Sequence, residues 1–325
     1  MTFIAYLFAV LKNTIYGTTI FFTGTLSETV DVLDILALRF LFSLVVIWLL
    51  KITRVVKIRV GLRDFLCRGE RGVAMKSVLL TALFEPVLYM FFETLGISMT
   101  SGITAGVILS LSAVTSCIFE ILILKEDSTL LQKLFLALGI FGAIYIAVNA
   151  NSAEGKDTPL GIIFILLTVI AGSLFSTFSR KSSRNFSAME ITYVSCMLGA
   201  IVFNAVNVVR HLIAGDILHY FDPYLIPGNL VGFFVLAVLS TIVATAMNNF
   251  ALSRMQASTM AAFGGISTLV TVVVSVWLGG ETLYPYHYIG FAFILVRMIG
   301  VSVIAIRRDR QRARAAASPA PDTPQ

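Results

Sequence analysis

Six ionisable side chains interrupt long apolar stretches of the sequence, where a charge is costly and by default marks a functional site. They are Lys12, Arg39, Glu85, Glu93, Glu120 and Arg297. Three are basic and three are acidic, so they can neutralise one another. Their depths, counted at about 1.5 Å per helical residue, predict a Lys12–Glu85 pair near mid-depth and an Arg39–Glu93 pair nearer one surface. Each pair either takes part in solute binding or only locks two helices together.

The stretch around Glu85 carries the clearest pattern. Four polar side chains recur there at intervals of four residues: Thr81, Glu85, Tyr89 and Glu93. This spacing places them on one face of a helix. Pro86 removes one backbone hydrogen bond from that helix and predicts a kink beside Glu85. A carboxylate beside a kink and opposite an amine can bind an amino group or carry a proton, so Glu85 and Glu93 are the candidate proton carriers.

The composition indicates which elements must position these residues. Hydrophobic residues make up 58% of the chain and charged residues 13%, whereas about a quarter of the residues in soluble domains are charged. The apolar runs are about twenty residues long without alternation, which predicts membrane-spanning helices rather than barrel strands. The net charge of +6 arises in short connections and in the C-terminal tail, as membrane topology requires. We therefore predict an all-α integral membrane protein with the lipid bilayer as partner and no nucleic acid.

Ten transmembrane helices are predicted. They cover residues 3–24, 33–51, 76–97, 101–124, 130–150, 159–179, 190–210, 229–251, 257–279 and 287–306. Lysine and arginine gather in alternate connections and in the tail, whereas the other connections hold only Lys156 and Arg210. By the positive-inside rule, both termini face the cytoplasm of a bacterial inner (cytoplasmic) membrane. Residues 307–325 are basic and then rich in Ala, Ser and Pro, which predicts a disordered cytoplasmic tail.

The second half of the sequence matches the first at a constant shift of 155 residues. The matching positions are Gly17-Thr18 with Gly172-Ser173, Ser98 with Ser253, Thr104 with Thr259, and Ser112 with Ser267. This pattern predicts a five-span repeat over residues 1–150 and a second over residues 151–306. Because five is an odd number, the second repeat crosses the membrane in the opposite orientation. Inverted repeats recur in secondary transporters, with the solute site near the midplane between the halves.

The predicted solute-binding site combines residues from both halves. Asn248 occupies the position equivalent to Glu93 and stands next to Asn249, so the first half would offer ionic contacts and the second half amide hydrogen bonds. Tyr16 and Tyr89 would form aromatic walls, although packing between helices also explains each of them. The complete predicted set is Lys12, Tyr16, Arg39, Glu85, Tyr89, Glu93, Asn248 and Asn249.

This organisation resembles the drug/metabolite transporter superfamily, specifically its EamA-type bacterial members. Residues 37–40, Ala-Leu-Arg-Phe, are similar to the Leu-Arg-Phe segment of that family. Glu126 and Glu281 match the acidic residue that closes the fourth span of each family repeat. Ala113 and Thr268 stand where the family often has proline, so straighter helices are expected there. The resemblance implies a solute exporter or importer in which the fifth and tenth spans are peripheral to the central cavity.

We therefore expect a secondary transporter that moves a small metabolite, amino-acid-like or otherwise amphipathic, by alternating access, with export and proton coupling as the working hypothesis. A nucleotide-sugar or sugar-phosphate exchanger is the alternative within the superfamily, and a membrane receptor or assembly protein is the alternative from another class. An enzyme is not expected, because no His-Glu-x-x-His motif or Ser/His/Asp set is present. Three isolated cysteines, Cys67, Cys117 and Cys196, predict no metal or cofactor. The sequence leaves monomer and homodimer open.

Overall fold

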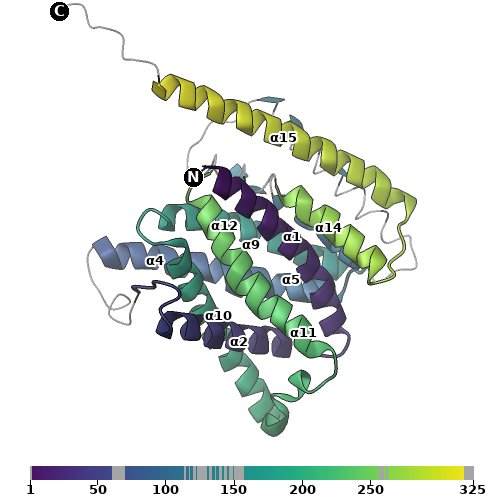
Figure 1. Cartoon of the computed structure of the whole chain (residues 1–325). Coiled ribbons are helices and arrows are strands. Elements are labelled where there is room, and N and C mark those ends of the chain that lie inside the picture. Colours follow the sequence, from purple (N-terminus) through teal and green to yellow (C-terminus); the bar gives the residue numbers. More distant parts are fainter. Residues whose placement is uncertain are drawn as a thin grey trace, which may run out of the picture.

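A computed structural model describes residues 2–60, 70–112, 157–255 and 263–317, together with Met260 and scattered positions between 115 and 149. Every regular element in these ranges is a helix (Figure 1). The elements are α1 (Thr2–Ser27), α2 (Val32–Ile52), α4 (Glu70–Ala82), η1 (Leu83–Leu88), α5 (Tyr89–Ser98), α6 (Gly102–Leu109), α9 (Pro159–Ser182), α10 (Ala188–Ala214), η2 (Ile217–His219), η3 (Asp222–Tyr224), α11 (Asn229–Phe234), η4 (Val235–Ala244), α12 (Thr245–Leu252), α14 (Gly264–Trp277) and α15 (Pro285–Ala317).

Six helical runs are long and apolar enough to cross a membrane. They are Ile4–Ser27, Val32–Ile52, Met75–Ser98, Pro159–Ser182, Ala188–Ala214 and Asn229–Leu252. These runs coincide with the predicted first, second, third, sixth, seventh and eighth spans, while α14 and α15 overlap the predicted ninth and tenth. Part of the predicted fourth span and about half of the predicted fifth, together with Glu120 and Glu126, lie outside the described residues. The count of ten spans therefore stays a prediction.

The C-terminal helix extends further than the sequence pattern indicated. A disordered tail was predicted from residue 307, but α15 continues to Ala317. Arginine and alanine dominate this extension, and both are strong helix formers, so the backbone continues as a helix beyond the apolar span. Residues 318–325 lie outside the described part of the chain.

Two spans contain π-helical turns, which occur frequently at functional sites. In η1, Glu85 has φ −138° and ψ 114°, which are non-helical values, and Pro86 follows it. The predicted kink beside Glu85 is therefore confirmed. The second π-helical run is η4 in the eighth span. The shift of 155 residues moves η1 onto residues 238–243, which fall inside η4, so both halves are interrupted at equivalent positions.

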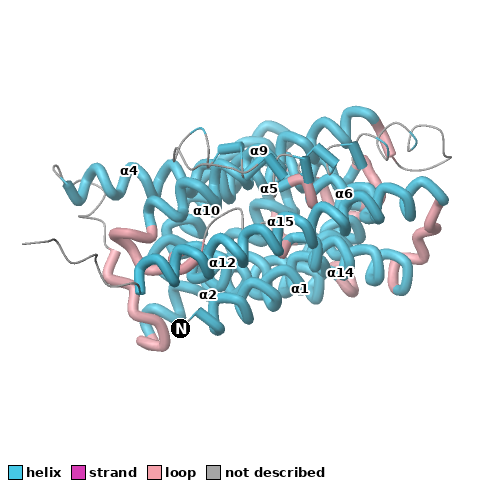
Figure 2. The backbone as a smooth tube through the Cα atoms, turned by 90° about the horizontal axis from the view of Figure 1, so that it is seen from above, coloured by secondary structure: helices cyan, strands magenta, loops and turns pink. Residues whose placement is uncertain are grey.

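The helices pack as pairs around the middle of the bundle (Figure 2). Helix α1 lies against α14 and against η4 and α12, while α9 lies against α5 and α6. Helix α2 lies along α10, and Figure 1 shows α15 on the side of the bundle away from that pair. Apolar clusters fill the contacts, one of them between α2, α10 and α11 around Phe40, Phe203 and Phe233. The middle of the bundle is thus framed by α1, the third span, α9 and α12.

Gly17 allows α1 to approach α14 closely. A Cβ atom at Gly17 would lie 2.6 Å from both the Ser267 carbonyl oxygen and the Val270 Cβ atom, and Thr271 donates a hydrogen bond to the Gly17 carbonyl at 3.1 Å. We predict that Gly17→Ala lowers the free energy of unfolding by roughly 2 kcal/mol through overpacking. Thermal unfolding in detergent would measure the effect.

Gly24 provides the matched control on the same helix. Its added Cβ atom would meet only the Ile97 Cγ2 atom, at 3.7 Å, which is an ordinary contact. Gly24→Ala should therefore leave the melting temperature unchanged or raise it, because alanine favours a helix over glycine. Equal melting temperatures for the two variants would show that the α1–α14 contact is not as tight as the structure has it.

Candidate functional site

A cavity of about 100 Å³ lies in the middle of the bundle. Six of the eight predicted site residues line it: Lys12, Tyr16, Glu85, Tyr89, Glu93 and Asn248. They come from α1, η1, α5 and α12, so elements far apart in the sequence converge on one space. The cavity has apolar walls and three charged residues, of which Glu85 and Glu93 are buried and Lys12 is partly buried. It can therefore hold a small solute that carries charge, because each charged group of the solute would meet a partner that is already desolvated.

Lys12 and Glu85 carry opposite charges and both line this cavity. They attract each other electrostatically, but no direct ion pair joins them within the part of the chain that the structure describes. The Lys12 ammonium instead lies 4.8 Å from the centre of the Tyr16 ring, a cation–π distance. The structure thus brings both members of the predicted pair to one cavity without a direct ion pair between them.

Two tyrosines in the cavity lining are held in place by hydrogen bonds from their hydroxyl groups. The Tyr89 hydroxyl donates a hydrogen bond to Glu93 Oε1 at 2.9 Å, one helical turn away on α5. The Tyr16 hydroxyl shares a hydrogen bond of 3.2 Å with Thr245, which ties α1 to α12. Because each hydroxyl already has a protein partner, the rings are held in place and the Glu93 carboxylate keeps one oxygen for another donor.

Arg39 does not line the cavity, and its predicted ion pair with Glu93 is wrong. Its side chain is fully buried, and one terminal nitrogen donates to the Leu236 carbonyl oxygen at 3.3 Å, to Ser240 at 3.4 Å and to Thr241 at 3.1 Å. All three acceptors belong to η4. Depth along the span therefore did not predict the direction of Arg39, because its acceptors belong to the π-helical turns of η4.

Asn249 also lies outside the cavity lining. Its amide accepts a hydrogen bond from Ser179 at 2.7 Å and donates one to Thr192 at 3.0 Å. These bonds connect α12 to α9 and α10, so Asn249 joins helices, whereas its neighbour Asn248 reaches the cavity. Neighbouring residues on a helix point about 100° apart, which is why only one of the two adjacent asparagines can face the solute.

Small polar side chains complete the lining and were missed by the prediction. They are Asn13, Ser112, Ser116, Ser176 and Ser267. Ser116 is buried, and its hydroxyl has no hydrogen-bond partner among the described residues, so it is free to bind a solute. The sequence repeat could have indicated two of these residues, because Ser112 and Ser267 occupy equivalent positions in the two halves.

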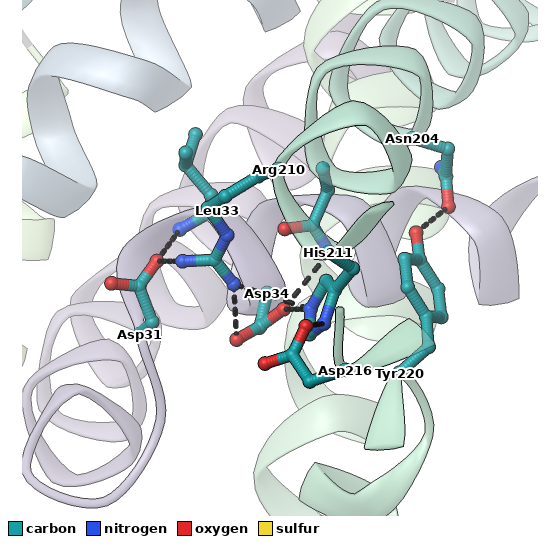
Figure 3. A network of polar contacts seen from close by, with 9 residues as sticks. Asp31, Leu33, Asp34, Asn204, Arg210, His211, Asp216 and Tyr220 are labelled. Carbon is teal, nitrogen blue, oxygen red and sulfur yellow. Dashed lines mark hydrogen bonds and ion pairs between the residues drawn. The ribbon is translucent and has the colours of Figure 1, made fainter. Parts of the chain in front are cut away.

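A second polar group lies apart from the cavity, where α2 begins and α10 ends (Figure 3). We call it the Asp34 cluster: Asp31, Asp34, Arg210, His211 and Asp216. Arg210 bridges Asp31 at 2.5 Å and Asp34 at 2.7 Å. The two ring nitrogens of His211 contact Asp34 at 2.9 Å and Asp216 at 2.8 Å. The cluster therefore fastens α10 and the segment after it to the start of α2.

Tyr220 extends this attachment. Its ring packs against His211 with centroids 5.2 Å apart, and its hydroxyl donates to Asn204 Oδ1 at 2.7 Å. Burial raises the pKa of Tyr220 above its ordinary value, so the hydroxyl keeps its proton and remains a donor.

The model of the EamA-like transporter family matches the chain twice, over residues 3–148 and 159–303. The chain belongs to the EamA-like transporter family. A relative from Bacillus subtilis (strain 168), the uncharacterized transporter YcxC, is 30% identical over 299 residues, which cover 92% of this chain and 93% of that protein. The chain is thus a multi-pass membrane protein of a transporter family, as its resemblance to EamA-type proteins indicated.

A solved crystal structure has the same fold as this EamA-like chain. It superposes with a TM-score of 0.62, and the alignment covers 93% of this chain and 98% of the other. The identity is 17%, so the likeness concerns the fold alone.

Proposed function

We propose that this EamA-like protein is a secondary transporter for a small zwitterionic or amphipathic metabolite of the amino-acid type. The observation that carries the proposal is the sign of the charges in the cavity, where Lys12 supplies one ammonium group and Glu85 and Glu93 supply two carboxylates. An amino group of the solute fits the carboxylates, and a carboxylate of the solute fits Lys12 and the free hydroxyl of Ser116. The described part of the site has no further charged lining residue to bind a third solute charge.

The cavity argues against the nucleotide-sugar or sugar-phosphate alternative. A phosphorylated solute needs several cationic or hydrogen-bond-donating partners, whereas the acidic lining residues outnumber the basic ones here. The volume of about 100 Å³ is also below the roughly 300–1,000 Å³ of pockets for larger ligands. A receptor or assembly protein would not require a cavity in the middle of the bundle that is lined by charges of both signs.

Alternating access is supported by the pairing of the helices. The shift of 155 residues moves α1 onto α9 and the third span onto the eighth. It also moves the predicted fourth span, which begins with α6, onto the predicted ninth span, which contains α14. The contacts of α1 with α14 and α12 therefore correspond to those of α9 with α6 and α5. Two halves with equivalent packing and opposite orientation have two packings of similar energy, one open to each side. We propose that both termini are cytoplasmic and that the physiological direction is export, with a proton gradient as the energy source.

A flux assay tests the function. The purified protein is reconstituted in liposomes loaded with a pH-sensitive dye, and pools of amino acids and other small metabolites are added to wild type and to liposomes without protein. A solute-dependent proton flux supports coupled transport. Exchange of labelled solute without proton flux would mean that the protein exchanges solutes and does not couple their transport to protons. Absence of any flux with either readout for zwitterionic solutes would overturn the proposed substrate class.

A further inference from the structure

Gly264, the first residue of α14, lines the cavity without a side chain. A Cβ atom placed there would meet one atom of the described residues within 4 Å, the Ser112 Oγ atom at 3.7 Å, which is an ordinary van der Waals contact. Ser112 lines the cavity as well. The space beside Gly264 is thus part of the cavity, and a side chain at this position would fill it.

A second lining glycine has a different role. At Gly172 on α9, an added Cβ atom would lie 2.8 Å from the Cε2 atom and 2.9 Å from the Cδ2 atom of the Tyr89 ring. The ring therefore lies directly on the backbone of α9, and its hydroxyl donates to Glu93 at 2.9 Å. Gly172 accommodates a side chain of the protein, whereas Gly264 leaves space that the described protein atoms do not occupy.

The internal repeat shows that this space belongs to one half of the protein. The shift of 155 residues that pairs Ser112 with Ser267 also pairs Leu109 with Gly264, and all four residues line the cavity. The first half thus places a leucine side chain at this position, where it packs onto a buried apolar cluster. Of the two equivalent positions, the one in the second half leaves space for a group of the solute.

The volume of the cavity limits what this space can hold. The cavity measures about 100 Å³, whereas a protein cavity that binds benzene measures roughly 150 Å³. The solute must also bring its amino group and its carboxylate to Lys12, Glu85 and Glu93, which line the same cavity. The volume that remains beside Gly264 fits a short side chain and excludes an aromatic ring.

We propose that Gly264 is a specificity-determining residue that sets the size limit of the solute, and that the solute is an amino-acid-type zwitterion with a short side chain, such as that of alanine or serine. The short side chain occupies the space beside Gly264, next to the Ser112 hydroxyl. The charged ends of the solute meet the charged lining residues. This inference rests on the proposed function for the identity of the solute, but the size of the space can be measured without transport.

Thiol labelling measures this space directly. The thiol introduced by Gly264→Cys is treated with methyl methanethiosulfonate or benzyl methanethiosulfonate, and modification of the peptide that contains residue 264 is followed by mass spectrometry. Each rate is divided by the rate at Thr25→Cys, an exposed position near the end of α1, which removes the intrinsic reactivity of the reagent. The benzyl reagent should react at least about tenfold more slowly than the methyl reagent. Equal relative rates, or no reaction with either reagent, would overturn the size limit.

Gly264→Ala tests selectivity in liposomes. The added methyl group narrows the space without a clash, so the ratio of serine flux to glycine flux should fall about tenfold relative to wild type. Gly172→Ala is the matched control, because its methyl group displaces the Tyr89 ring and lowers both fluxes alike, which leaves the ratio within twofold of wild type. An unchanged ratio in Gly264→Ala, or an equal fall in both variants, would count against a specific role of Gly264.

Failure of this inference and failure of the proposed function give different results. If wild type transports no amino acid but the labelling series shows the size limit, the proposed function fails and the size limit at Gly264 stands. If wild type transports phenylalanine as fast as serine, the size limit is wrong and the proposed transport function stands.

Discussion

Replacing Glu85 by glutamine is expected to lower solute flux by about 30-fold or more. Glu85 lines the cavity together with Lys12, is 7% exposed, and lies beside the kink at η1. Glutamine has nearly the same shape but can neither take up a proton nor pair with an ammonium group. Removing one partner of a desolvated charge contact costs roughly 2–5 kcal/mol, and each 1.4 kcal/mol corresponds to about tenfold. Initial rates of solute-dependent flux in liposomes would measure the loss.

Two control variants separate this effect from a general loss of folding. Glu190→Gln is the matched substitution outside the cavity, because Glu190 belongs to the capping box of α10 and glutamine also serves in that position. It should transport at the wild-type rate. Lys12→Met with Glu85→Gln removes both charges together, so it should fold at least as well as Glu85→Gln and remain inactive. Flux within threefold of wild type in Glu85→Gln would place the transport pathway elsewhere.

The transmembrane helices that the structure describes could be predicted closely, because an apolar run of sufficient length has no other stable state in a bilayer. The four-residue stripe around Glu85 was only partly right. Glu85, Tyr89 and Glu93 do line the cavity, but Thr81 donates to the Ser77 carbonyl oxygen and contacts Ser182 on α9. Thr81 precedes the non-helical backbone at Glu85, and beyond that break the phase of the helix changes.

The direction of a buried side chain could not be predicted from its position along the span. Arg39 and Asn249 were assigned to the solute site because they are polar and lie at the right level. Whether such a residue faces the cavity or a neighbouring helix depends on which neighbour has unsatisfied polar groups. For Arg39 that neighbour is η4, whose π-helical turns have no proline signal comparable to the one in η1. The acceptors that decide its direction therefore cannot be recognised from one sequence.

The Asp34 cluster was not predicted, because its members are far apart in the sequence and Arg210 was assigned only to a connection between spans. Asp34 is the centre of the cluster. It accepts from Arg210 at 2.7 Å, from His211 at 2.9 Å and from Asn207 at 2.9 Å. His211 places both ring nitrogens on carboxylates, an arrangement that favours the imidazolium form, in which both nitrogens carry hydrogen. Within the cluster, two cations are thus held by three carboxylates.

Asp34→Ala is accordingly expected to lower the free energy of unfolding by about 3 kcal/mol, near the lower limit for breaking a buried ion pair because the cluster is partly open to solvent. The substitution leaves the side chains of Arg210 and His211 3.3 Å apart without the carboxylate that neutralises their charges.

Asp222→Ala is the matched control. Among its charged neighbours in the described chain, Asp222 contacts only the exposed His219, and exposed ion pairs contribute at most about 1 kcal/mol. Thermal unfolding in lipid nanodiscs would compare the two. The destabilisation by Asp34→Ala should shrink as the pH rises and His211 loses its charge, whereas an effect that is the same at every pH would mean that Asp34 acts by packing and not through its ionic partners.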